Sequence, residues 1–277
     1  MKNKQFLALI FSMIFCFFNN AQNTEKIKGN RSVTIQQTLI NSFHTIMIDN
    51  DFEVDIIYNK EPSVEIETDE NLHEFIEFQV RDSILSFHKT RRITSKKRLY
   101  IKVNYDDFLA HIETRDNGEI HALTTMELNN VNVKTTGNSR AGLTIKTDMF
   151  NFEGLDKSKV KLNLTCDSTK LIINGYSKLE ALINSPILHA DLYQRSNAII
   201  EGNSDELTLI MDNNCSDENK MASISSFCSG VKVVSNNSLE KPRIAFTGVL
   251  ISWLILAKNS SFICKDFSAK SLDASSS

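Results

Sequence analysis

Two histidines and two glutamates surround a turn in the segment HIETRDNGEIH, which spans residues 111–121. If this segment formed an antiparallel hairpin about its D-N-G turn, His111 would face His121 and Glu113 would face Glu119. Two imidazoles and two carboxylates brought together in this way are a metal-ligand set. The alternative is a corner between two diverging strands whose polar residues face water. A repeat described below favours the corner, so we predict no metal here.

The carboxylate pair Asp106 and Asp107, in the segment NYDDFL (104–109), is a second candidate for chemistry. Glycoside-cleaving enzymes use paired carboxylates as general acids, bases and nucleophiles. Aspartate is also an ordinary turn residue, and no set of basic and acidic residues accompanies this pair at a fixed spacing. The sequence favours a turn, with a polysaccharide lyase or hydrolase as the alternative function.

Arg140, Lys159 and Lys178 recur at intervals of nineteen residues. If successive units stack as paired strands, these cations form a row with about 4.8 Å between neighbours. Two further lysines flank the row, Lys157 and Lys161. Two acidic residues lie near it in the sequence, Glu180 and Asp156. Partial neutralisation of the row by these two carboxylates favours a simple solvated face. The alternative hypothesis is that the row binds carboxylate or sulfate groups of an acidic glycan.

The interval of nineteen extends to apolar residues, so it is a structural repeat. Steps of nineteen from Val133 reach Phe152, Leu171, Ala190 and Leu209. Within each unit apolar and polar residues alternate, which is typical of strands with one buried face. Two short strands in nineteen residues bury their apolar face only by stacking on neighbouring units. The sequence therefore predicts an all-β fold, a parallel β-helix (β-solenoid) with coils of about nineteen residues.

Serines also recur in this register, at Ser139, Ser158, Ser177 and Ser196. Each shares the parity of the buried positions and follows a corner. We place these corners at Gly118, Gly137, Asp156 and Gly175. Glycine and aspartate suit corners because they tolerate positive φ or bond to their own backbone. A buried hydroxyl needs a hydrogen-bond partner. We therefore interpret the four serines as a structural ladder, since a nucleophile would occur once.

The repeat is absent between residues 27 and 105, although strands are predicted at 52–58, 63–68, 83–88 and 99–105. Residues 69–76 are predicted to form one or two helical turns with Asp69 near the start. This region is expected to cap the N-terminal end of the solenoid, since an open terminal coil exposes unpaired strand edges. The predicted divisions are 22–110 for the cap, 111–246 for the regular coils and 247–277 for the C-terminal strand and tail.

The first residues predict export: two lysines precede an apolar stretch that is too short to span a bilayer. We expect a signal peptide at residues 1–21, periplasmic or surface localisation with the periplasm favoured, and no transmembrane span in the mature chain. Four cysteines remain after cleavage: Cys166, Cys215, Cys228 and Cys264. The sequence leaves open whether these cysteines form disulfides or are buried free thiols.

The segment 249–257 is almost wholly apolar and includes Trp253. Its length suits a strand and is too short for a membrane-spanning helix. Burial between the solenoid and the tail is favoured, and a homo-oligomer or partner contact is the alternative.

Bulk composition excludes some classes of function. The chain has 277 residues, is 41% hydrophobic and carries a net charge of −3, so it can bury a core and has no basic block for nucleic acid. Neither a glycine-rich phosphate loop nor a Ser/His/Asp signature occurs, so we expect no cofactor.

The signal peptide, the segments FEVDIIYNKEPSVEIETDENL and VRDSILSFH, and the coils with Gly-x-Ser corners together resemble the putative auto-transporter adhesin, head GIN domain family of Gram-negative bacteria. The likeness covers roughly residues 27–245. It implies an exported right-handed β-helix and carries no catalytic residue over to this chain. The chain departs from the family's glycine-rich pattern at Asp156 and at Arg195-Ser196. The expected function is a non-enzymatic envelope protein for adhesion or glycan binding, with a structural or regulatory periplasmic module as a further alternative.

Overall fold

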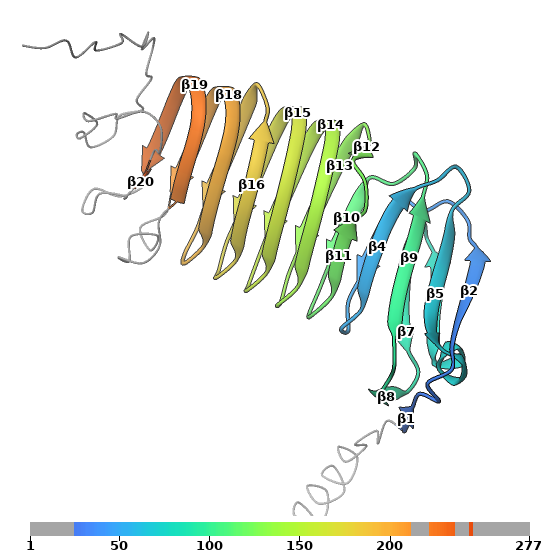
Figure 1. Cartoon of the computed structure of the whole chain (residues 1–277). Coiled ribbons are helices and arrows are strands. Elements are labelled where there is room, and N and C mark those ends of the chain that lie inside the picture. The colour runs from blue at the N-terminus through green and yellow to red at the C-terminus, as the bar shows by residue number, and fades with distance from the viewer. Residues whose placement is uncertain (1–24, 212–221, 236–243, 246–277) are drawn as a thin grey trace, which may run out of the picture.

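The structure of the chain, a computed structural model, describes residues 25–211, 222–235 and 244–245. These residues form an elongated stack of β-strands with one short helical segment (Figure 1). The stack is a β-solenoid of parallel coils, which confirms the predicted fold class. Antiparallel strands close its N-terminal end.

The regular coils each contain two strand segments and two corners. Their strands are β13 (Asn130–Thr135), β14 (Arg140–Gly154), β15 (Lys159–Ile173), β16 (Lys178–Asn184), β17 (Ile187–Leu192) and β18 (Asn197–Met211), followed by the backbone of β19 (Ala222–Ser235) and β20 (Ile244–Ala245). Arg140 lies beside Lys159 and Gly154 lies beside Ile173, so adjacent coils are offset by nineteen residues.

A continuous apolar core fills the space between the two faces of the coils. In β14, Leu143 and Ile145 project inward from one face, and Phe150 and Phe152 from the other. The alternate side chains are half-buried or exposed, as a strand with one buried face requires. Burial of these apolar side chains supplies the main favourable free energy of folding, at about 25 cal/mol per Å².

The first corner of each coil contains a residue with positive φ. The column consists of Asp116 (53°), Gly137 (70°), Asp156 (59°), Gly175 (75°) and Gln194 (56°). Glycine adopts this left-handed conformation freely and aspartate tolerates it. Gln194 shows that the stack also holds a less suited residue there.

One corner assignment from the sequence is wrong, because the first regular coil contains 21 residues. Ile112 pairs with Val133, an offset of 21, whereas Met126 pairs with Ile145, an offset of nineteen. The two extra residues are accommodated in the bend at 123–125. Gly118 therefore corresponds to Ser139, and Asp116 occupies the corner. An insertion of two leaves the alternation of buried side chains intact, which hides it in the sequence pattern.

The order of coils along the stack differs from the order along the chain. The strands concerned are β3 (Thr45–Ile48), β4 (Glu53–Tyr58), β7 (Ile84–Lys89), β9 (Leu99–Tyr105), β10 (His111–Thr114), β11 (Glu119–Ala122) and β12 (Met126–Glu127). The coil made of β3 and β4 pairs in parallel with β7 and β9 on one side and with β10 and β11 on the other. In Figure 1, β4 accordingly lies between β9 and β11.

Antiparallel strands form the N-terminal cap. They are β2 (Val33–Leu39), β5 (Ser63–Asp69) and β6 (Ile76–Arg81), together with the separate parallel pair β1 (Lys26–Lys28) and β8 (Arg92–Ser95). β2 and β5 extend the sheet from β9, and β6 extends the opposite sheet from β7. The predicted helical turns form a 3-10 helix, η1 (Glu70–Phe75), that connects β5 to β6.

Several expectations lie outside the described residues. These are the signal peptide at 1–21, the apolar segment 249–257 with Trp253, and the side chains of Cys215, Cys228 and Cys264. Cys166 is described and is a buried free thiol. No helix among the described residues is long and apolar enough to cross a membrane.

Candidate functional site

The basic row consists of Arg140, Lys159 and Lys178, which are direct neighbours in the parallel ladder of β14, β15 and β16. All three residues are exposed. Glu119 continues the column on one side and Asn197 on the other. The stacking therefore places three cations on adjacent strands, with spacings of about 4.8 Å between the strands.

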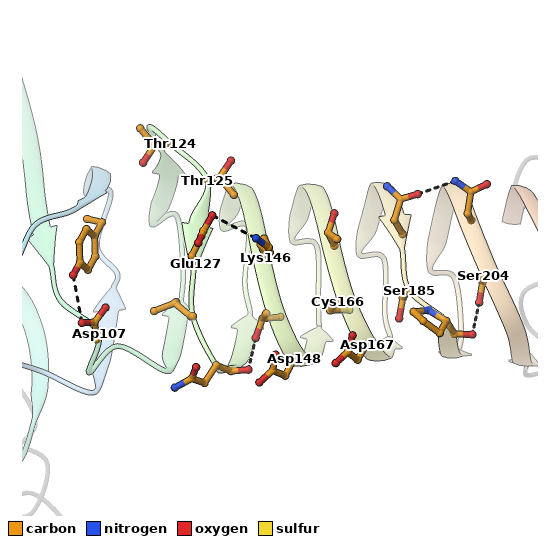
Figure 2. A pocket seen from close by; sticks show the side chains of 18 of the residues that line it. Asp107, Thr124, Thr125, Glu127, Lys146, Asp148, Cys166, Asp167, Ser185 and Ser204 are labelled. Carbon is orange, nitrogen blue, oxygen red and sulfur yellow. Dashed lines mark hydrogen bonds and ion pairs between the residues drawn. The ribbon is translucent and has the colours of Figure 1, made fainter.

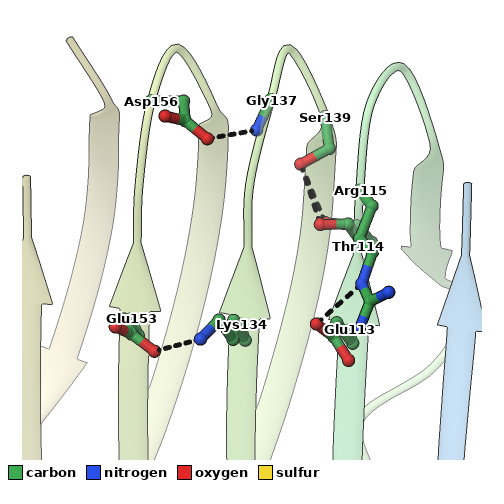
Figure 3. A network of polar contacts seen from close by, with 8 residues as sticks. All are labelled: Glu113, Thr114, Arg115, Lys134, Gly137, Ser139, Glu153 and Asp156. Carbon is green, nitrogen blue, oxygen red and sulfur yellow. Dashed lines mark hydrogen bonds and ion pairs between the residues drawn. The ribbon is translucent and has the colours of Figure 1, made fainter. Parts of the chain in front are cut away.

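Acidic neighbours neutralise only part of this surface. Arg140 lies 3.6 Å from a carboxylate oxygen of Glu119, and Lys161 lies 3.7 Å from one of Glu180. Among the described residues, no ion pair involves the three remaining lysines of the surface, Lys157, Lys159 and Lys178. Within the described part of the chain, Asp156 forms no ion pair with the row; its carboxylate accepts a hydrogen bond of 2.9 Å from the Gly137 N–H (Figure 3).

A shallow groove of about 410 Å³ lies along the basic row. Its lining includes the row itself, Lys161, Gly142 and His121. A side chain on Gly142 would place its Cβ 2.8 Å from Nδ1 of His121, so the glycine leaves room for the imidazole. Nε2 of His121 lies 3.0 Å from the Glu119 carboxylate. The groove therefore presents cations from three coils.

An aromatic and a further cation, which sequence reasoning missed, lie at the corner next to this row. Tyr176 is 50% exposed, and the Arg195 guanidinium donates a hydrogen bond of 2.8 Å to its hydroxyl. The guanidinium also lies 5.5 Å from the ring centroid, a cation–π geometry. Both residues lie at steps of nineteen from Lys157, so the repeat could have identified them as neighbours of Lys157 in one column of the stack.

The four repeated serines line the inside of the first corner and are at most 3% exposed. Ser139 Oγ accepts a hydrogen bond of 3.0 Å from the hydroxyl of Thr114 on the preceding coil (Figure 3). Ser158 accepts the equivalent bond of 2.9 Å from Thr135. These hydroxyls connect neighbouring coils and face away from solvent.

The last two serines lack a threonine opposite them. Gly154 occupies that position for Ser177, whose hydroxyl donates to the Gly154 carbonyl at 3.0 Å. Ile173 occupies it for Ser196, whose hydroxyl has no partner within the described part of the chain.

A larger groove of about 1220 Å³ runs along the second corner of five coils (Figure 2). The inward residues of this corner are Thr147, Cys166, Ser185 and Ser204. Each donates a hydrogen bond to the carbonyl two residues further on, at 3.3, 3.5, 2.8 and 2.9 Å respectively. Cys166 is therefore a member of a second polar ladder.

The outward residues of the second corner include Asp148 and Asp167, and the same groove contains Asp107 at its N-terminal end (Figure 2). Asp106 accepts hydrogen bonds from the Ser42 hydroxyl and from the Phe108 N–H, as expected of a turn residue. The Tyr58 hydroxyl donates to Asp107 at 3.3 Å. Partial burial of Tyr58 and the charge of Asp107 raise the pKa of this tyrosine.

The hairpin that would assemble a metal site does not form, because β10 and β11 pair with different strands. His111 lies instead beside His44, with ring centroids 5.3 Å apart. Burial and the neighbouring His44 lower the pKa of His111. Within residues 25–211, no group of three or more metal-ligating side chains is found.

Comparison with known proteins places the fold among adhesin-like proteins. Solved structures with this fold include a putative adhesin from Parabacteroides merdae ATCC 43184 (17% identity, TM-score 0.55, covering 80% of this chain and 99% of that chain). Putative adhesins from Parabacteroides distasonis ATCC 8503 (17% identity, TM-score 0.52, 80% and 100% covered) and from Bacteroides fragilis NCTC 9343 (14% identity, TM-score 0.60, 79% and 97% covered) also have it. No curated protein matches the chain. The family model described as "Putative auto-transporter adhesin, head GIN domain" matches residues 42–183, and the chain belongs to this family.

Proposed function

We propose that this protein is an exported, non-catalytic component of the bacterial cell envelope that uses its solenoid surface for adhesion by binding an acidic glycan. The basic row is the observation that carries the proposal. Its three cations come from neighbouring strands in register, and two of them, Lys159 and Lys178, form no ion pair among the described residues. Stacked like charges are unfavourable unless water or a bound anion screens them.

The ligand class follows from the spacing of the charges. A row with a constant interval of about 4.8 Å fits a polymer with regularly repeated anionic groups better than a small molecule with one such group. Lys157 and Arg195 add positive charge at the adjoining corner, and Tyr176 adds an exposed aromatic face. Family membership supports a role in adhesion, since the family is described as a head domain of adhesins.

The test is binding of acidic and neutral polysaccharides to the wild type and to a triple variant, Arg140→Gln, Lys159→Gln and Lys178→Gln. Exposed charge pairs contribute about 0.5 kcal/mol each, so we expect the triple variant to bind an acidic polysaccharide about tenfold more weakly. Added salt should weaken wild-type binding, because the interaction is between exposed charges.

A matched control changes three lysines outside the row, Lys134, Lys146 and Lys170, to glutamine. This variant loses the same net charge and should bind as the wild type does. Equal weakening in both triple variants would show that net charge, not the row, causes binding. Binding that is insensitive to both the row variant and salt would exclude the row as the site. Protease treatment of intact cells tests the location, because a surface protein is degraded and a periplasmic protein is protected.

A further inference from the structure

Strand β2 forms an edge of the large sheet at the N-terminal end of the solenoid (Figure 1). Within the described residues it pairs only with β5, so its other edge has no strand beside it. Two of its large aliphatic side chains are exposed, Ile35 at 62% and Leu39 at 70%. β2 thus combines unpaired backbone groups with apolar side chains that face water.

The sequence of β2, VTIQQTL, has no feature that protects an edge strand from pairing. It contains no charged residue, no proline and no glycine, whereas natural edge strands commonly carry lysine, proline or a bulge. β6, the edge strand of the opposite sheet, provides the contrast. It carries Glu77 and Arg81 within six residues. Of these two edges, only β2 is chemically suited to accept another strand.

The flanking hydrogen bonds show which backbone groups point outward from β2. The Ile40 N–H donates to the Pro62 carbonyl, and the Glu70 N–H donates to the Ser32 carbonyl. These are directly opposed pairs in the antiparallel register with β5, and hydrogen-bonded pairs alternate along such a ladder. The even-numbered residues of β2 therefore bond to β5. The backbone groups of the four odd-numbered residues point to the open edge: Val33, Ile35, Gln37 and Leu39.

The strand is nearly symmetric about Gln36. Antiparallel pairing of two copies about this residue places Val33 opposite Leu39, Thr34 opposite Thr38, Ile35 opposite Gln37, and Gln36 opposite its own copy. In this register every odd-numbered residue faces another odd-numbered residue. Each such pair exchanges two backbone hydrogen bonds. Apolar residues and threonines at opposed positions are favourable cross-strand pairs.

We propose that β2 is a homodimerisation strand, through which two copies of this chain pair antiparallel about a two-fold axis at Gln36. The occupant is a second copy because the strand is complementary to itself in a register that also satisfies its outward backbone groups. Pairing sets Ile35 and Leu39 beside side chains of the partner strand on the same face and joins the two solenoids through one continuous sheet. The interface is separate from the basic row, so the inference does not depend on glycan binding.

The first experiment measures mass in solution by sedimentation equilibrium of the full chain at concentrations up to about 100 μM. We expect a dimer for the wild type and a folded monomer for Ile35→Lys, because a charge at this edge opposes pairing. The matched control is Leu182→Lys, which alters an exposed leucine on a regular coil and should remain dimeric. A monomeric wild type, or a dimer that persists in Ile35→Lys, would overturn the proposal.

The second experiment tests the register by disulfide cross-linking. In the proposed pairing, Gln36 and its copy form a non-hydrogen-bonded pair with Cα atoms about 4.5 Å apart, which a disulfide can bridge. Gln36→Cys should therefore yield a reducible dimer under mild oxidation at several times the wild-type level. In Thr38→Cys the introduced thiols are displaced by about 13 Å along the strands, so cross-linking should stay at the wild-type level. Equal cross-linking at both positions would contradict the two-fold register.

Discussion

The two corners of each coil close the chain in different ways. The first corner uses a residue with positive φ, such as Gly137 or Asp156, followed two residues later by a buried serine. In the coils of Ser139 and Ser158 that hydroxyl bonds to a threonine of the preceding coil. At the second corner, residues 147–149, 166–168 and 185–187 contain no positive φ. There the buried hydroxyl or thiol bonds to the carbonyl two residues further along its own turn, and Thr147 also donates to the Asn129 carbonyl of the preceding coil at 2.7 Å.

This difference explains which corner has a regular sequence. At the first corner the serine is constant while the residue opposite it changes from threonine to glycine and isoleucine, so the tight, buried position next to the positive-φ residue favours a small side chain in every coil. At the second corner the inward side chain needs only to be small and to donate a hydrogen bond to a backbone carbonyl, either of its own turn or of the preceding coil. Threonine, cysteine and serine all meet that condition, and all three occur at the second corner.

The largest effect is expected from overpacking the first corner. Ser158 is fully buried against Thr135, so Ser158→Leu should lower the free energy of unfolding by about 2 kcal/mol. The control is Lys159→Leu at the next, exposed position, where a change below about 0.5 kcal/mol is expected. Urea unfolding followed by circular dichroism measures both. Equal losses would mean that the inward and outward assignments of this strand are wrong.

A smaller effect separates serines that have partners from the one that has none. Ser139→Ala removes a hydroxyl that bonds to both Oγ1 and the carbonyl of Thr114, and should cost about 1 kcal/mol. Ser196→Ala removes a buried hydroxyl with no partner in the described residues, so stability should stay the same or rise slightly. Urea unfolding of both variants under the same conditions measures the change in the free energy of unfolding for each. An equal cost would show that the hydrogen-bond partner on the preceding coil does not contribute to stability.

The smallest effect is expected at the second corner. Cys166→Ser should change stability by less than about 0.5 kcal/mol, because the equivalent residue of other coils carries a hydroxyl. The native Cys166 thiol is buried, so wild type and variant should label equally with an aqueous thiol reagent until the protein unfolds. Rapid labelling of one additional thiol in the folded wild type would contradict its placement in this ladder.

The solenoid and the serine ladder could be predicted because each coil repeats the same local pattern at a fixed interval. The position of the coil formed by β3 and β4 could not, since it pairs with strands distant in the chain and leaves no period. The misplacement of Gly118 has a related cause: the two-residue insertion preserves the alternation that the prediction relied on. The second ladder was not apparent in the sequence because its four positions hold three different residue types. Tyr176 and Arg195 were not apparent because neither is a lysine, although both lie at steps of nineteen from Lys157.

We expect the position of the coil formed by β3 and β4 to set the order in which the chain folds. His111 pairs with Thr45, 66 positions earlier, whereas the coils from β14 to β18 pair with residues nineteen positions away. Closing the longer loop costs more conformational entropy before any contact compensates for it, and non-local pairing slows folding. We therefore expect the N-terminal third to form the rate-limiting nucleus, after which the regular coils add one at a time. A chain exported from its N-terminus would deliver its segments in the order that this nucleus requires.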